Sequence, residues 1–182
     1  TDNKPHMRIE CRYIPAGPSI QDEIANAAFW VGLMKARPEN VKKIWEHFDF
    51  KDVKSNFFKA ARSGVESVFV WRGKTISAHD LIKNELLPLA HEGLKNCGFS
   101  NEEIYVYLGT IEKRLSSSTG SQWQVRNFRN LKKEMNVSDA LNALTEFMHD
   151  QQKQNTAVCA WPDIQIPAAL KKQVANMRIV KQ

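Results

Sequence analysis

Three charged side chains near the amino end alternate with apolar ones. Of all segments in the chain, this one has the residue types and spacing that best suit binding of a metal ion or an anion. The segment reads Arg8-Ile9-Glu10-Cys11-Arg12. Successive side chains of a β-strand point to opposite faces, so a strand here would place Arg8, Glu10 and Arg12 on one face. A glutamate oxygen suits a hard cation, and arginines pair with phosphate or carboxylate oxygens. The alternative is a solvated edge strand whose charges alternate in sign.

The residues that follow predict how this segment would be positioned. Pro15-Ala16-Gly17-Pro18 should end the strand, because proline lacks a ladder donor and glycine permits a turn. Ser19 is then expected to cap a helix over roughly residues 19–36.

The rest of the chain reads as mostly helical. A β-hairpin is predicted where β-branched and aromatic residues flank Arg72-Gly73-Lys74. A long helix should run from Asp80 to Gly98 with a kink at Pro88, and Ser100 with Glu103 forms a capping box for the next helix. The predicted fold class is α+β and predominantly helical: an N-terminal β-strand followed by a helix bundle with one β-hairpin. Further helices are expected at 41–48, 52–64, 121–135 and 138–152.

A second candidate for ligand binding lies in the most polar loop of the chain. Residues 116–121 read Ser-Ser-Ser-Thr-Gly-Ser and lead into Gln122-Trp123-Gln124. A loop rich in hydroxyl groups that enters a helix leaves free N–H groups, which suit an anion. The loop lacks the spacing of a phosphate-binding P-loop. The alternative is an N-cap at Thr119 with Trp123 anchoring the helix to the core.

Composition indicates an ordinary globular protein. The 182 residues suit one domain, and no apolar run approaches the roughly twenty residues that a membrane helix needs. The three cysteines have no zinc-site spacing and fit a reducing cytoplasm. The net charge of +6 is compatible with nucleic acid or with an anionic cofactor such as ATP. The lysines between residues 42 and 59 are interpreted mainly as a solvated face.

An ordered set of motifs resembles the glutamine synthetase superfamily. Within it the chain looks most like the glutamate–cysteine ligase and carboxylate–amine ligase branch. The resemblance covers roughly residues 7–162. It rests on the R-x-E-x-R segment and its following helix, 56–64 (NFFKAARSG), 85–94 (ELLPLAHEGL), 119–124 (TGSQWQ) and Trp161-Pro162.

The resemblance implies ATP-dependent amide ligation with Mg²⁺ and ATP as cofactors. A glutamate-like acid would be activated as an acyl phosphate and attacked by an amine such as that of cysteine. Carried over by motif, Glu10 would be a Mg²⁺ ligand and Arg12 the catalytic residue that holds the transferring phosphoryl group or the substrate carboxylate. The remaining cofactor-binding residues would be Arg8, for the nucleotide phosphates, together with Arg62, Thr119 and Gln122.

The resemblance also predicts how the chain is organised. Residues 1–165 would be the C-terminal portion of a ligase catalytic domain of glutamine-synthetase-like fold, and residues 166–182 a basic tail. Because the superfamily fold needs further strands and metal ligands, we expect a missing N-terminal part of the same protein as a partner and an inactive fragment without it. We expect a cytoplasmic protein linked to glutathione biosynthesis, with small-molecule substrates and a possible homo-oligomeric state.

Some features leave alternatives open. Where some relatives carry a glycine–aspartate turn, this chain has Ile14-Pro15-Ala16-Gly17, so the amine substrate is not fixed. Arg62 could be structural instead of functional. Two rival classes remain. One is a helical interaction module without chemistry. The other is a basic nucleic-acid binder, which the interleaved acidic residues disfavour. We expect neither nucleic acid nor membrane as a partner.

Overall fold

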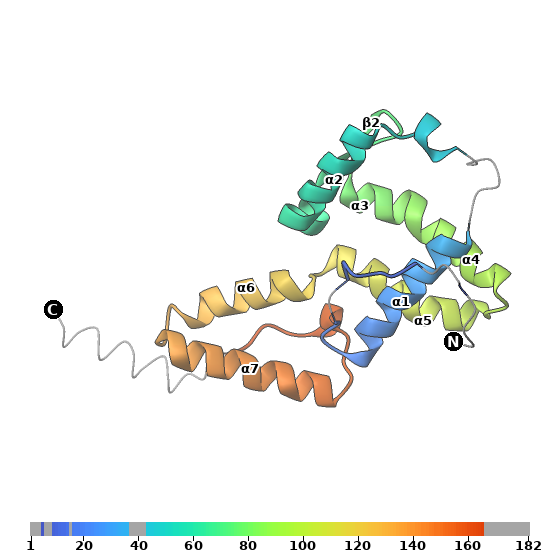
Figure 1. Cartoon of the computed structure of the whole chain (residues 1–182). Coiled ribbons are helices and arrows are strands. Elements are labelled where there is room, and N and C mark those ends of the chain that lie inside the picture. Colours follow the sequence, from blue (N-terminus) through green and yellow to red (C-terminus); the bar gives the residue numbers. More distant parts are fainter. Residues whose placement is uncertain (1–4, 6–8, 15, 37–42, 166–182) are drawn as a thin grey trace, which may run out of the picture.

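The computed structural model describes residues 5, 9–14, 16–36 and 43–165. Within these ranges the chain is predominantly helical with one small antiparallel sheet, as the sequence predicts (Figure 1). Three groups of elements can be distinguished: a central group of helices from residues 20–35 and 87–116, a pair of helices in residues 120–153, and an arm formed by residues 44–77.

The central group is built on α1 (Ile20–Lys35), α4 (Leu87–Asn96) and α5 (Asn101–Ser116). Ser19 caps α1, and Ser100 with Glu103 forms the predicted capping box of α5. The core residues Ala90, Leu94, Ile104 and Leu108 pack against the apolar side of α1. α1 and α4 cross closely at glycines: a Cβ on Gly93 would overlap the backbone of Gly32 and Ala36. Small residues therefore set this crossing.

The second core joins α6 (Gly120–Leu131) to α7 (Val137–Lys153) and to the returning chain at η4 (Val158–Ala160). Trp123 is fully buried at its centre, stacked on Phe147 at 5.4 Å between ring centroids and edge-on to Trp161 at 5.1 Å. The indole N–H of Trp123 donates to the carbonyl of Pro162 at 3.1 Å. The aromatic side chains thus fasten the return segment onto the helix pair.

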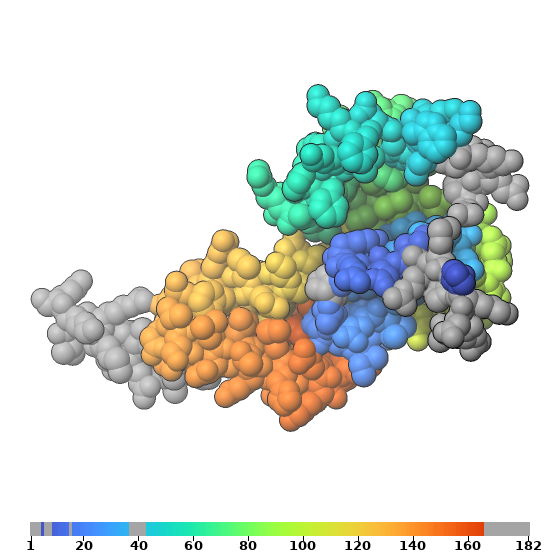
Figure 2. Space-filling model, in the orientation of Figure 1, coloured from blue at the N-terminus to red at the C-terminus, as the bar shows by residue number. Residues whose placement is uncertain are grey.

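The arm consists of η1 (Ile44–Glu46), α2 (Phe50–Ser63), η2 (Gly64–Glu66), β1 (Val68–Trp71) and β2 (Lys74–Ser77). Val68 faces Ser77 and Trp71 faces Lys74 across the hairpin, and the positive φ of Arg72 and Gly73 makes the tight turn. The Asn56 amide pairs with both backbone groups of Val70, at 2.7 and 3.0 Å. Figure 2 shows the arm as a separate lobe above α1 and α6.

A π-helical turn connects the arm to the centre. After α3 (Ala78–Leu81), residues Ile82–Leu86 form η3, in which the Leu87 N–H donates to the Ile82 carbonyl five residues back. Pro88 follows at the start of α4, and it has no N–H and its ring crowds the carbonyl four residues earlier. The kink predicted at Pro88 thus takes the form of a widened turn just before it.

Two sequence predictions are wrong. Residues 9–12 have no strand structure, because the two described strands pair only with each other and an unpaired segment has no ladder to join. The predicted helix over 41–48 is reduced in the described part to the short η1, with Val41 outside the described residues. Helix boundaries also shift: Asp49 caps α2 and Asn136 caps α7, instead of Asp52 and Ser138.

Candidate functional site

Glu10 and Arg12 point to the same side of the chain although the segment is not a strand. Arg12 donates to the Glu10 carboxylate from Nε at 2.7 Å, and its Nη2 lies 2.5 Å from the same oxygen. The Arg12 side chain is 84% exposed and that of Glu10 38% exposed. The two charges therefore neutralise each other at the surface. Arg8, the third member of the predicted group, lies outside the described residues.

Arg62 lies in the last turn of α2 and is exposed. A cation in this position is favoured by the partial negative charge of the helix C-terminus. Within the described ranges its guanidinium has no hydrogen bond or ion pair, so it is accessible to an anion from solution. Its cofactor-binding role stays a prediction.

Thr119 and Gln122 form a capping box at the start of α6. The Thr119 hydroxyl accepts from the Gln122 N–H at 3.3 Å, and the Gln122 side-chain oxygen accepts from the Thr119 N–H at 2.9 Å. The Gln122 amide then donates to Glu66 in η2 at 3.1 Å. The N-cap and the burial of Trp123 are thereby confirmed, while ligand binding by Thr119 and Gln122 stays a prediction.

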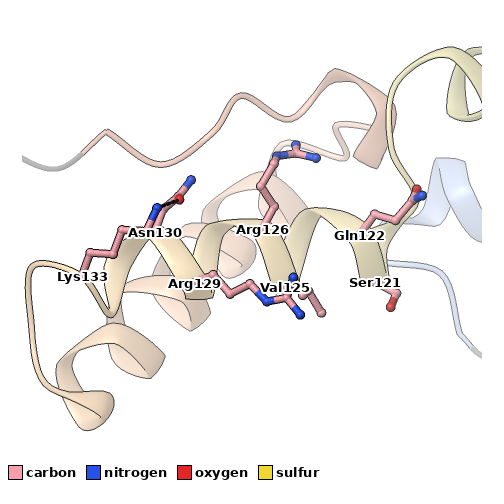
Figure 3. Close-up of a pocket in the computed structure, with 7 residues that line it drawn as sticks. All are labelled: Ser121, Gln122, Val125, Arg126, Arg129, Asn130 and Lys133. Atoms are coloured by element: carbon pink, nitrogen blue, oxygen red, sulfur yellow. Dashed lines mark hydrogen bonds between the residues drawn. The ribbon is translucent and has the colours of Figure 1, made fainter.

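Gln122 also lines a groove of about 510 Å³ that follows the exposed face of α6 (Figure 3). Arg126 and Arg129 of α6 and Lys133, which lies in the turn after it, supply three cations to the lining of this groove, although Figure 3 shows Arg126 and Arg129 pointing to different sides of the helix. We call this the α6 groove. Its remaining lining residues are Ser121, Val125 and Asn130. Three cations beside hydroxyl and amide groups give it the chemistry of a binding surface for an extended anion.

The cations of the α6 groove differ in their present partners. Arg126 is paired with Asp163, at 2.8 Å from Nη2 and 3.0 Å from Nε. Lys133 donates to the side-chain oxygen of Asn130 at 3.2 Å, a contact visible in Figure 3. Arg129 has no hydrogen bond or ion pair within the described part of the chain. Of the three cations, Arg129 can thus bind an anionic ligand without first breaking a contact within the described part of the chain.

Asp163 is the anionic counterpart of this cluster. The hydrogen bonds from Arg126, and secondarily one from the Asn127 amide at 3.1 Å, hold the pKa of the Asp163 carboxyl below its usual value. Asn127 is buried and its own oxygen accepts from the Ile164 N–H at 2.8 Å. The return segment therefore lies against α6 through a set of polar contacts.

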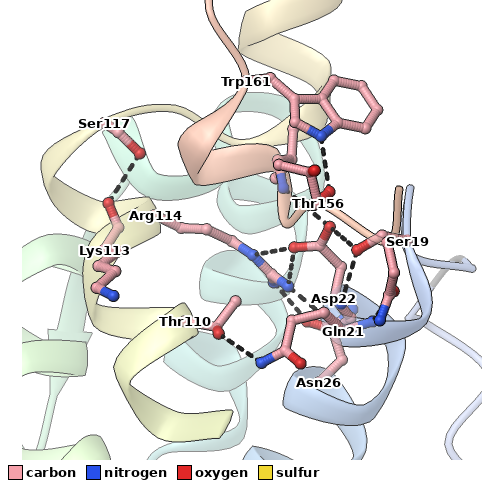
Figure 4. Close-up of polar contacts among 12 residues, drawn as sticks. Ser19, Gln21, Asp22, Asn26, Thr110, Lys113, Arg114, Ser117, Thr156 and Trp161 are labelled. Carbon is pink, nitrogen blue, oxygen red and sulfur yellow. Dashed lines mark hydrogen bonds and ion pairs between the residues drawn. The ribbon is translucent and has the colours of Figure 1, made fainter. Parts of the chain in front are cut away.

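A buried ion pair holds the parts of the molecule together (Figure 4). Asp22 in α1 is fully buried, and the guanidinium of Arg114 in α5 lies 2.7 Å from its carboxylate. The same carboxylate accepts from the Ser19 hydroxyl at 2.7 Å and from the Val158 N–H at 3.0 Å. Asp22 therefore joins α1, α5 and η4 at one point.

Sequence reasoning missed the residues that form these two clusters. The proximity of Arg126, Arg129 and Lys133 is visible in the sequence and could have indicated a group of cations along a helix. Asp22 and Arg114 lie 92 residues apart, and no local pattern distinguishes them from exposed helix charges. Their pairing follows only from how α1 and α5 pack.

The described residues lack the ligand set of the metal that the sequence resemblance implies. Mg²⁺ needs several oxygen ligands, and Glu10 offers one carboxylate that is already paired with Arg12. Across the described ranges no group of three or more His, Cys, Asp or Glu side chains could hold a metal ion. The described residues thus do not by themselves fit a magnesium site. In the same ranges no helix is long and apolar enough to span a membrane.

Comparison with known proteins adds no relative. No family model, no curated protein and no solved structure matches the chain.

Proposed function

We propose that this chain is part of an ATP-dependent carboxylate–amine ligase similar to glutamate–cysteine ligases, and that its fold is a portion of a glutamine-synthetase-like fold. One observation carries the proposal furthest: the 3.1 Å hydrogen bond from Gln122 to Glu66. It joins the segment that contains Thr119 and Gln122 to the turn that directly follows the segment ending at Gly64. Two of the motifs that suggested the ligase are thus neighbours, as parts of one site would be.

Electrostatics supports the same proposal. Ligation of this kind crowds phosphate and carboxylate charge, and arranged cations lower the energy of that charge. The α6 groove supplies Arg126, Arg129 and Lys133, and it begins beside the N-terminus of α6, whose partial positive charge also favours anions. We assign the α6 groove to the anionic phosphates of the nucleotide, with Gln122 at its end.

The chemistry itself would be amide formation from a glutamate-like acid and an amine, with ATP as phosphoryl donor. The roles left to this chain are binding and orientation. Arg12 would exchange its contact with Glu10 for an anionic oxygen of substrate, since an exposed ion pair of this type contributes at most about 1 kcal/mol. No step is assigned to Mg²⁺, because the described residues do not complete its ligand set. A further portion of the same protein would complete the site.

The test measures ADP release by the complete protein that contains this chain. We expect release to require both a glutamate-like acid and an amine, and to fall by about 100-fold or more in Arg12→Gln. Glu146→Ala is the matched control, because Glu146 is an exposed carboxylate on α7 outside the groove. ATP turnover that is unchanged in Arg12→Gln would contradict the proposal.

A second candidate function, a non-catalytic interaction module, is favoured by the apolar surface of the arm. Phe50 is 79% exposed, Trp45 70%, and Phe57 and Phe58 61% each, and α2 has no buried residue. Exposed aromatic clusters of this kind often mark protein interfaces. This candidate predicts a folded chain that binds neither ATP nor Mg²⁺ in titration calorimetry. Binding of ATP that is lost in Arg129→Gln would count against it.

A further inference from the structure

A second polar pocket, of about 200 Å³, lies between the α3–η3 segment and α5. His79 of α3 and Lys83 of η3 line one side, and Tyr105, Gly109 and Lys113 of α5 line the other. None of its lining residues lines the α6 groove. The pocket therefore combines residues from two segments that are more than twenty positions apart in the chain, and it is separate from the proposed ligase site.

Two backbone features form the pocket. Gly109 is buried and has no side chain, so only backbone atoms line the pocket between Tyr105 and Lys113. A Cβ added at Gly109 would meet only the Tyr105 ring, at 3.9 Å, so the space above it is open. On the opposite side Lys83 belongs to the π-helical turn that Pro88 imposes, and such widened turns recur at functional sites.

The charges of the pocket are predominantly positive. Lys83 and Lys113 face it, and among the described residues neither ammonium group lies within ion-pairing distance of a carboxylate. Glu112 is the one carboxylate in the lining. Asp80 lies just outside, with its carboxylate 3.8 Å from His79 and accepting the Ser77 hydroxyl at 2.7 Å. The lining thus includes two lysines, a histidine and a tyrosine, which are residue types that can donate hydrogen bonds to an anion.

We propose that this pocket binds a small dianionic oxyanion, either a phosphate group or a short dicarboxylate. Its volume is sufficient for a phosphate group or about six to eight heavy atoms and no more, by comparison with the 300–1,000 Å³ of ordinary ligand pockets. Lys83 and Lys113 approach the anion from opposite sides, and the Tyr105 hydroxyl donates a third hydrogen bond. The site is independent of the proposed ligase function.

The test is titration calorimetry of the full chain with inorganic phosphate and, separately, with succinate. Whichever anion binds, Lys83→Gln and Lys113→Gln should each raise its dissociation constant about tenfold or more, because each removes one charge-assisted hydrogen bond. Gly109→Leu should abolish binding by filling the floor. Thermal melts followed by circular dichroism show whether each variant is folded. If Gly109→Leu does not fold, the dissociation constants of the two lysine variants alone test the proposal.

Lys95→Gln is the matched control, since Lys95 lies on α4 outside both sites, and it should leave the dissociation constant unchanged. Binding of phosphate alone identifies a phosphate site, and binding of succinate alone identifies a dicarboxylate site. The proposal is overturned if neither anion binds at 10 mM, a level about tenfold above a weak millimolar affinity. It is also overturned if binding survives both lysine substitutions and is lost instead in Arg129→Gln, which would place the anion in the α6 groove.

Discussion

Asp22 and Arg114 are the pair on which the arrangement of α1, α5 and the return segment depends most. The Asp22 carboxylate is fully buried, while Arg114 is 15% exposed. Arg114 also donates from Nη1 to the Asn26 side chain at 2.6 Å. A buried charge that loses its partner is strongly destabilising, whereas an exposed pair contributes little.

We therefore expect Arg114→Met to lower the free energy of unfolding by about 3–5 kcal/mol, because the Asp22 charge stays buried without its counter-ion. The matched control is Arg72→Met, which removes the partly exposed pair of Arg72 with Glu85 and should lower the free energy by at most about 1 kcal/mol. Urea unfolding followed by circular dichroism measures both. Equal losses in the two variants would show that the Asp22 pair has no special role.

The Asp163 carboxylate gives a prediction on pH. Since its pKa is lowered in the folded protein, mainly by Arg126, the ion pair stabilises the fold above the unfolded-state value of about 3.9. That contribution is lost as the pH falls through the lowered folded-state pKa. Because the side chain is 43% exposed, screening limits the effect to about 1 kcal/mol or less.

Asp163→Asn should thus be less stable than the parent chain at pH 7, and the difference should shrink as the pH falls from about 4 toward 3. Chemical unfolding at pH 7, 5, 4 and 3.5 tests this. Asp150→Asn, which changes an exposed carboxylate on α7, should not reproduce the trend. A difference that grew toward low pH would have the wrong sign for a lowered pKa.

At the scale of elements, glycines decide how closely helices approach. Gly93 lies where a Cβ would overlap the backbone of α1, and backbone cannot move aside as a flexible side chain can. Gly109 is also buried in a helix, yet a Cβ there would make an ordinary contact with the Tyr105 ring at 3.9 Å. An alanine should thus destabilise the fold at position 93 but not at position 109.

We expect Gly93→Ala to destabilise the chain by about 1–3 kcal/mol or more, because α1 and α4 must separate to accept the methyl group. Gly109→Ala should be neutral or stabilising by up to about 1 kcal/mol, since alanine favours a helix interior. Thermal melts of the two variants make the comparison. Tolerance of alanine at both positions would mean that the close crossing of α1 and α4 is not maintained in solution.

At the scale of the whole molecule, burial is unevenly distributed. The central helices α4 and α5 contribute Ala90, Leu94, Ile104 and Leu108 to one core, while α2 contributes no buried residue. The Asn56–Val70 pair joins α2 to β1 within the arm, and polar contacts such as the bond from the Trp71 indole to Glu85 at 3.0 Å connect the arm to the rest of the molecule. Elements with few buried contacts open at low free energy.

Amide hydrogen exchange should accordingly be slowest in α4 and α5 and fastest in α2 among the helices of eight or more described residues. Asn56→Ala should accelerate exchange further in β1 and α2, with little change in α5, because it removes both contacts to Val70. Mass spectrometry of peptic fragments provides the measurement. Uniform protection across α2, α4 and α5 would contradict a weakly held arm.

The sequence by itself determined the elements whose signals are local. Each of these signals involves residues within a few positions of one another, so tertiary contacts are not needed to predict the element. Examples are the caps at Ser19 and Ser100, the Arg72-Gly73 turn and the irregular turn before Pro88. The strand prediction over 8–12 failed in its described part because a strand also requires a partner, which alternation of charge cannot supply.

Only the tertiary structure decided which distant residues meet. Three features join segments that are separated by tens of residues in the chain. They are the pairing of Asp22 with Arg114, the contact of Gln122 with Glu66, and the pocket between Lys83 and Lys113. The spacing of apolar residues in a sequence indicates which side of a helix is apolar, but it does not indicate which other helix packs against that side. The physical reason is that the shapes of the side chains at a crossing determine how two helices pack, as at Gly32 and Gly93. The positions of the crossings then determine which charged side chains are buried and which are exposed.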